Sequence, residues 1–107
     1  MSWSVETLTD TVMAKLDALP LDMSARFSRI ALLIAEHGLD RVREPYVKHL
    51  EGPLWEMRMG GRDGISRAIY VTAKGRRVVV VRVFVKKTEK TPRSEIELAR
   101  RRAEEVR

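Results

Sequence analysis

The feature that most constrains the fold is a run of four consecutive valines at residues 78–81. A strand that is apolar at every position suits the middle of a sheet covered on both faces better than an edge with one wet side. The run lies within a longer segment of strand composition, residues 77–86. We therefore expect a central strand here, at the middle of the core.

Two further segments of strand composition precede this one. Residues 54–59 and 66–72 contain β-branched or aromatic side chains and are bounded by turn-forming residues. The stretches 60–64 and 73–76 contain glycine and suit hairpin loops, which join antiparallel neighbours. The second half of the chain therefore predicts an antiparallel meander.

The first half of the chain has the three- and four-residue apolar spacing of helices. After a short strand around residues 3–5, apolar residues at positions 8, 12, 16 and 19 line one face of a helix that ends at Pro20. A second helix is expected from Asp22, as its cap, to Gly38. The two helices predict a hairpin that covers one face of the sheet.

A third helix is expected near the end of the chain. Thr91 and Pro92 have the pattern of an N-cap followed by proline at the first helical position. The apolar stripe that follows is narrow, so we expect this helix to be weakly docked. The predicted fold class is α+β, a helical hairpin packed on a small antiparallel β-sheet with a C-terminal helix, and residues 1–107 are expected to form a single domain.

Composition narrows the possible chemistry. The chain has no cysteine and two histidines, so disulfides, thiolate nucleophiles and a metal site are not expected, and we predict no cofactor. The longest dense apolar stretch, residues 30–35, is too short to span a bilayer, and no signal-peptide pattern is present. We therefore expect a cytoplasmic protein with no membrane partner.

Positive charge is concentrated in the second half. Residues 1–50 contain six Lys/Arg against seven Asp/Glu, whereas residues 51–107 contain fifteen against eight, within a total net charge of +6. Such asymmetry is typical of a protein with a polyanionic partner, because phosphate contacts release counterions. The alternative is a basic surface that only keeps the protein soluble, since net charge alone does not identify a partner.

Strand alternation places a group of cations on one side of the predicted sheet. Glu56 and Arg58 share one strand face, and Arg67 lies on a face of the next strand. In the third strand Arg82 and Lys86 share a face, and Lys87 begins the loop that follows. If these strands are hairpin partners, Arg58, Arg67 and one of the two lysines converge on a single patch. Such crowding is tolerable where an anion binds, so the cluster predicts a phosphate site.

The same cluster has a catalytic interpretation. When a ribose 2′-hydroxyl attacks the neighbouring phosphorus, negative charge accumulates on the phosphoryl and 5′ oxygens, and fixed cations stabilise that transition state. Catalytic candidates are Arg58, Arg67, Lys86 and Lys87. Further candidate RNA contacts are Lys48, Arg82, Lys90 and Arg93.

A proton-transfer group is harder to identify. Glu56 is a possible general base, and an ordinary ion pair with a neighbouring arginine is the alternative. His37 is interpreted as a helix-end residue and His49, placed before the sheet, as a surface residue. Tyr70 and Trp55 are interpreted as packing residues.

Several motifs together resemble a known family. They are Tyr-Val-Lys-His-Leu at 46–50, Leu-Trp-Glu-Met-Arg at 54–58, Arg67 ahead of Ile-Tyr at 69–70, and Phe-Val-Lys-Lys-Thr-Glu-Lys-Thr-Pro at 84–92. In this order they resemble the RelE/ParE toxin superfamily, and most closely its phage-derived, HigB-type branch. The resemblance covers nearly the whole chain.

The resemblance implies a toxin of a type II toxin-antitoxin system, a metal-independent endoribonuclease that cuts mRNA on the ribosome and so inhibits translation. It also implies a cognate antitoxin, in this branch a HigA-like helix-turn-helix protein. Arg58 and Arg67 fall on positions that contact the scissile phosphate in RelE-like enzymes, and Lys86 and Lys87 fall near a third basic position. One departure is that no tyrosine or histidine follows Tyr70, whereas several relatives place a catalytic one near the carboxyl terminus.

Two other functions remain open at this point. ParE-type toxins of the same superfamily inhibit DNA gyrase by binding it, without cutting RNA. A basic nucleic-acid-binding module without catalysis is the third interpretation. The arginine and lysine pattern favours the ribonuclease.

Overall fold

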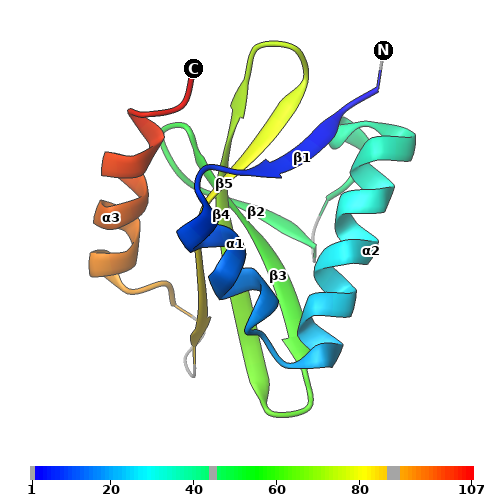
Figure 1. Cartoon of the computed structure of the whole chain (residues 1–107), viewed down its shortest axis with the longest axis vertical. Helices are drawn as coiled ribbons and strands as arrows, with labels where there is room; N and C mark the ends of the chain where they lie inside the picture. Colours follow the sequence, from blue (N-terminus) through cyan, green and yellow to red (C-terminus); the bar gives the residue numbers. More distant parts are fainter. Residues whose placement is uncertain (1, 44–45, 87–89) are drawn as a thin grey trace.

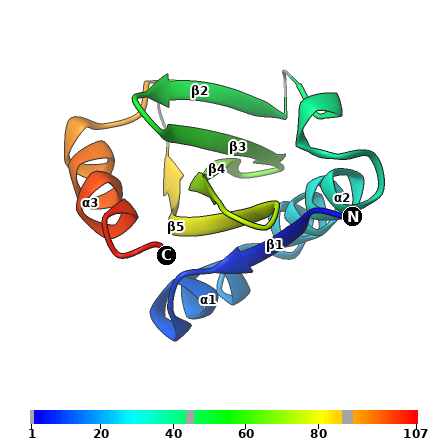
Figure 2. The same cartoon turned by 90° about the horizontal axis from the view of Figure 1, so that it is seen from above.

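The computed structural model describes residues 2–43, 46–86 and 90–107. Within these residues the elements are, in chain order, β1 (Ser4–Thr7), α1 (Asp10–Asp17), α2 (Leu21–His37), η1 (Leu39–Arg41), β2 (Val47–Glu51), β3 (Leu54–Gly61), β4 (Gly64–Ala73), β5 (Arg77–Lys86) and α3 (Arg93–Ala103). The strands form one sheet in the order β1-β5-β4-β3-β2. Figures 1 and 2 show α3 on one side of this sheet and α1 and α2 on the other.

Strands β2 to β5 form the predicted antiparallel meander. The predicted fold class is confirmed, since a helical hairpin and a C-terminal helix pack on the sheet. The antiparallel prediction is wrong for β1, which runs parallel to β5 with Ser4 opposite Arg77. The helices between them carry the chain back to the same end of the sheet, and parallel pairing needs such a crossover.

The edge strand β2 was not predicted from the sequence. Val47 is buried, but Lys48 and His49 are both exposed, so the strand lacks a clean inward and outward alternation. His49 lies within the sheet, directly opposite Trp55 of β3, and the prediction that it precedes the sheet is wrong. Edge strands often depart from the alternating pattern because only part of their surface packs on the core.

The larger apolar core lies between the helical hairpin and the sheet. Val12 of α1 and Ile30 and Ile34 of α2 are fully buried in one cluster with Met57 of β3 and Val80 of β5. Each fully buried aliphatic side chain contributes about 1.5–3 kcal/mol relative to exposure. This face of the molecule is therefore organised for stability.

The four valines occupy the central strand, as predicted. None of residues 78–81 is more than 2% exposed. Val78 and Val80 belong to the hairpin-side core, whereas Val79 and Val81 belong to a second cluster on the α3 side. The uninterrupted apolar run thus reflects burial on both faces of β5.

The start of α2 is held by a contact that the sequence did not reveal. The helix begins at Leu21 after Pro20, and Pro20 makes no side-chain cap hydrogen bond, so the prediction of Asp22 as the cap is wrong. The Asp22 carboxylate accepts instead from the amide of Arg62 in the β3–β4 turn, at 2.7 Å. A Cβ on Gly61 would lie 2.8 Å from the same carboxylate, so a larger residue there would force the Asp22 side chain to move.

Helix α3 docks on the opposite face through few apolar contacts and several polar ones. Ala99 is fully buried, and Arg102 donates to the carbonyl of Val81 at 2.8 Å. The helix starts at Arg93, and Pro92, which stands at its N-cap, makes no side-chain cap bond, so Thr91 is not the predicted cap. None of the helices in the described residues is long and apolar enough to cross a membrane.

Candidate functional site

The α3 side of the sheet gathers the cations predicted to converge. Arg58 of β3 lies directly opposite Arg67 of β4. In the next strand pair, Arg67 lies opposite Phe84 of β5. Lys86, two residues further along β5, shares the face of Phe84. Lys48 of β2 lies opposite Glu56, which completes the patch towards the sheet edge. The predicted shared face of Arg58, Arg67 and Lys86 is confirmed by this register.

The centre of the patch is a buried ion pair. The Arg67 guanidinium donates to Oε1 of Glu56, and each of the two residues is only 1% exposed. The hydroxyl of Thr91, also buried, donates to the second carboxylate oxygen at 2.8 Å. Both oxygens of Glu56 are therefore engaged, which is the condition for holding a charge in a low-dielectric interior.

Arg58 lies at the mouth of this patch. Its side chain is 30% exposed, and its Nε atom is 3.6 Å from Oε1 of Glu56, which is too long for a hydrogen bond. This Nε is itself buried and has no hydrogen-bond partner among the residues that the structure describes. A buried donor without an acceptor is costly, and it marks a place where an incoming acceptor would bind.

Lys86 lies deep on the same face, with only 5% of its surface exposed. Burial lowers the pKa of its ammonium group, and the nearby positive charge of Arg67 lowers it further, while the Glu56 carboxylate opposes both. Arg58 and Lys48 lower it as well. The four cations thus share one field around a single carboxylate, and an anion in that field would be stabilised.

Two of the predicted RNA contacts lie in ion pairs that anchor α3. Arg82 forms a bidentate ion pair with Glu95, in which Nε and Nη2 donate to the two carboxylate oxygens at 2.7 and 3.2 Å. Arg93 also forms a bidentate pair, with Glu51 at the end of β2, at 2.5 and 3.1 Å. Both side chains therefore join the helix to the sheet.

Lys90 is exposed beside the start of α3. Lys87, which was predicted as catalytic, lies outside the described residues. The roles assigned to these residues from the sequence stay predictions.

The sequence did not identify Thr91 as a partner of Glu56. Its place in a Lys-Thr-Pro segment predicted a helix cap, whereas its side chain points back to a strand 35 positions earlier in the chain. Tyr70 is buried at 1% exposure on the opposite face, as predicted, but Trp55 is 39% exposed and not simply a packing residue. Within the described residues, no group of three or more His, Asp or Glu side chains is arranged to hold a metal.

Comparison with known proteins gives the family and the fold. The model of the family "Phage derived protein Gp49-like (DUF891)" matches residues 14–104. Among solved structures, a chain of the archaeal RelE–RelB complex from Pyrococcus horikoshii OT3 is similar with a TM-score of 0.60 and 23% identity, over 79% of this chain and 96% of that one. None of the curated proteins matches the chain.

The structural likeness shows that this chain has a RelE-like fold, an α+β arrangement of helices on a five-stranded sheet. The family model covers most of the chain, including every residue of the cationic patch from Lys48 to Thr91. The chain therefore belongs to the phage-derived Gp49-like family.

Proposed function

We propose that the protein is the toxin of a type II toxin-antitoxin system, of the HigB type, and that it acts as a ribosome-dependent mRNA endoribonuclease. The family and the RelE-like fold support the toxin assignment. The observation that carries the enzymatic part is the patch around Arg58, where a buried donor has no hydrogen-bond acceptor among the described residues and lies among neighbouring cations. Such a site suits a phosphodiester.

The proposed reaction is a transesterification within the RNA. The 2′-oxygen forms a bond to the adjacent phosphorus while the bond from phosphorus to the 5′-oxygen breaks; the 2′-hydroxyl proton leaves to a base and the 5′-oxygen receives a proton. Arg58, the most exposed arginine of the patch, contacts the phosphoryl oxygens, and Arg67 supports the field from behind. One fixed donor aimed at the transition state is worth about 3 kcal/mol.

Lys86 is the candidate for proton transfer at this site. Its lowered pKa makes the ammonium a better acid than an ordinary lysine, and it lies on the same face as Arg58. Glu56 is the weaker candidate, since both of its oxygens already accept from Arg67 and Thr91. We therefore assign Glu56 the role of an ion-pair partner that positions Arg67, and not the role of a general base.

The proposed partners are mRNA on the ribosome and a cognate antitoxin. The similar structure is of a RelE–RelB complex, which supports an antitoxin partner for this chain. A HigA-like helix-turn-helix antitoxin belongs to the same proposal because it accompanies the HigB-type branch. Covering the patch around Arg58 would be sufficient to neutralise the toxin.

A purified translation reaction tests this proposal. Cut positions on a defined mRNA are mapped with and without ribosomes for the wild type, for Arg58→Ala and for Arg29→Ala, an exposed arginine on α2 that serves as the matched control. We expect cuts only with ribosomes, a rate at least one hundredfold lower for Arg58→Ala, and no change for the control. Wild-type activity that persists in Arg58→Ala would refute the assigned site.

A second measurement distinguishes the proposed ribonuclease from the ParE-type alternative, a gyrase inhibitor. Supercoiling by DNA gyrase is followed with the purified toxin present. We expect gyrase to be unaffected. Inhibition of gyrase together with intact transcripts would replace the proposed function by a non-enzymatic one.

A further inference from the structure

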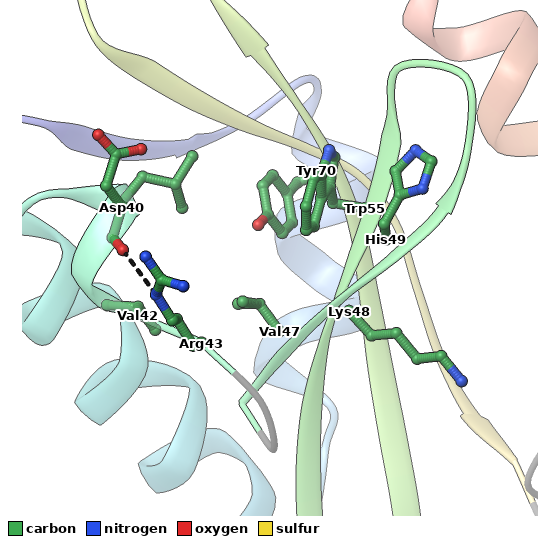
Figure 3. Close-up of a pocket in the computed structure, with 9 residues that line it drawn as sticks. Asp40, Val42, Arg43, Val47, Lys48, His49, Trp55 and Tyr70 are labelled. Carbon is green, nitrogen blue, oxygen red and sulfur yellow. Dashed lines mark hydrogen bonds between the residues drawn. The ribbon is translucent and has the colours of Figure 1, made fainter.

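A cavity of about 670 Å³ opens on the other side of the sheet edge from the cationic patch. Figure 3 shows its two walls, with Asp40 and Arg43 on one side and the rings of Tyr70, Trp55 and His49 on the other. The first wall comes from η1 and the two residues that follow it, Val42 and Arg43, and the second from β2, β3 and β4. The cavity is open, and no residue of α1 or α3 lines it.

The aromatic wall is a row across three neighbouring strands. His49 lies directly opposite Trp55, and Trp55 lies directly opposite Tyr70. The His49 and Trp55 rings are 4.9 Å apart between centroids, at 57°. Nε2 of His49 is hydrogen-bonded to the carbonyl of Gly52 at 2.9 Å, which fixes the orientation of its ring. The row is therefore a positioned aromatic surface.

Trp55 gives this surface its binding potential. Its side chain is 39% exposed, whereas Tyr70 beside it is buried and forms the floor. A partly exposed indole beside a cavity offers a large apolar ring to a ligand, with an N–H that can donate a hydrogen bond. Aromatic side chains on adjacent strands are a common platform for unpaired bases, because every base has a π-face that can stack.

Charge connects the cavity with the cationic patch. Asp40 and Arg43 line one wall of the cavity, and Lys48 lies at its edge, where Figure 3 shows its side chain directed away from the cavity, on the face of the sheet that holds Glu56. Lys48 also lowers the pKa of Lys86, so its positive charge reaches the patch on the other face of the sheet. A polyanion bound at Arg58 can thus pass Lys48 at the β2 edge and continue to the aromatic row.

We propose that this cavity binds the base of an RNA nucleotide that flanks the cut phosphodiester. The base stacks on Trp55, and Lys48 contacts the phosphate between the two sites. This inference rests on the proposed function for the identity of the strand. Stacking recognises any base, so the site adds affinity and position and does not select a sequence.

Fluorescence of Trp55 tests the occupancy directly. The Trp3→Phe variant leaves Trp55 as the only tryptophan of the chain. It is titrated with a short 2′-O-methyl oligonucleotide, which lacks the attacking hydroxyl and is not cut. We expect the indole emission to be quenched with saturation. An oligonucleotide that binds but leaves the Trp55 emission unchanged would overturn the proposal.

Binding by substituted proteins gives a second readout. Anisotropy of a labelled oligonucleotide is measured with Trp55→Ala and with Leu32→Ala, an exposed apolar residue of α2 that serves as the control. We expect about tenfold or greater weakening for Trp55→Ala and no change for the control. Lys48→Ala should reduce the dependence of log K on log salt concentration by about 0.7. Unchanged affinity in Trp55→Ala, with its fold verified by circular dichroism, would refute stacking.

These readouts are independent of cleavage. Cleavage that depends on Arg58 but not on Trp55, with no quenching, would leave the proposed function standing and remove this inference. Quenching of Trp55 by RNA without any cleavage by the wild type would keep the base-binding cavity and remove the ribonuclease.

Discussion

The two faces of the sheet differ in what they bury. The hairpin face packs apolar side chains of α1 and α2, such as Val12 and Ile34, against apolar strand residues. The α3 face also has an apolar cluster, but beside it Glu56, Arg67 and Lys86 are buried as charged or titratable groups. Burying a charge is unfavourable unless it is paired and hydrogen-bonded. The α3 face therefore contributes less to the free energy of unfolding than the apolar hairpin face does.

This contrast indicates where function lies. A buried ion pair is weak support for a role in stability, because apolar residues of similar size often stabilise as well or better. Buried charged side chains that cluster around one carboxylate are instead frequent in functional sites. The protein thus holds its larger apolar core on one face of the sheet and its candidate site on the other.

The largest expected effect is on the ion pair itself. Glu56→Ala leaves the Arg67 guanidinium buried without its carboxylate, so the free energy of unfolding should fall by about 4 kcal/mol. Urea denaturation at neutral pH measures it. Glu36→Ala, which removes an exposed carboxylate of α2, should change little. A loss below about 1 kcal/mol for Glu56→Ala would show that the pair is not desolvated.

A substitution that creates a cavity in the core on the hairpin face should lower stability without lowering activity. Ile34→Ala removes fully buried methyl groups and should lower the free energy of unfolding by about 3 kcal/mol. The rate of RNA cleavage, measured where the variant remains folded, should stay at the wild-type value. A hundredfold slower rate in the folded variant would contradict the division between the two faces.

The hydroxyl of Thr91 should contribute less. Thr91→Val keeps the shape but removes the donor to Oε2 of Glu56, which should cost about 2 kcal/mol and also slow cleavage by loosening Arg67. The same substitution at Thr11, which is exposed on α1, is the control. Equal behaviour of the two variants in denaturation and cleavage would remove Thr91 from the site.

The smallest effect concerns the pH dependence of stability. The pKa of Lys86 is lowered in the folded protein from its ordinary value of 10.5, so between the two values the unfolded chain binds more protons. The free energy of unfolding should therefore rise with pH through this window, and Lys86→Met should abolish that rise. Denaturation at a series of alkaline pH values checks it, with Lys15→Met, an exposed lysine, as the control. A rise that survives in Lys86→Met would assign it to another group.

Much of the fold follows from local patterns in the sequence. The four valines predict a strand buried on both faces, and period-two alternation correctly puts Arg58, Arg67 and Lys86 on one side. Hairpin loops with glycine predict the order of β3 to β5, because neighbouring segments pair locally. These features depend on residues close together in the chain.

The features that the sequence left undecided depend on distant residues. The parallel pairing of β1 with β5 joins segments more than 70 positions apart, and Thr91 reaches Glu56 across 35 positions. Asp22 looked like a helix cap, but it binds the amide of Arg62. Asp22 and Thr91 could each have capped a helix, but each makes a contact with a residue distant in the chain instead.

The most direct test of the central claim is to locate the RNA on the protein by NMR. Amide and arginine Nε resonances of the folded chain are assigned and followed during titration with the uncleavable 2′-O-methyl oligonucleotide. We predict that the largest shifts occur at Arg58, Arg67 and Lys86, with the Arg58 Nε–H moving most because it gains an acceptor. Shifts confined to the outer surfaces of α1 and α2, with the Arg58 Nε–H unmoved, would contradict the assignment of function to the α3 face.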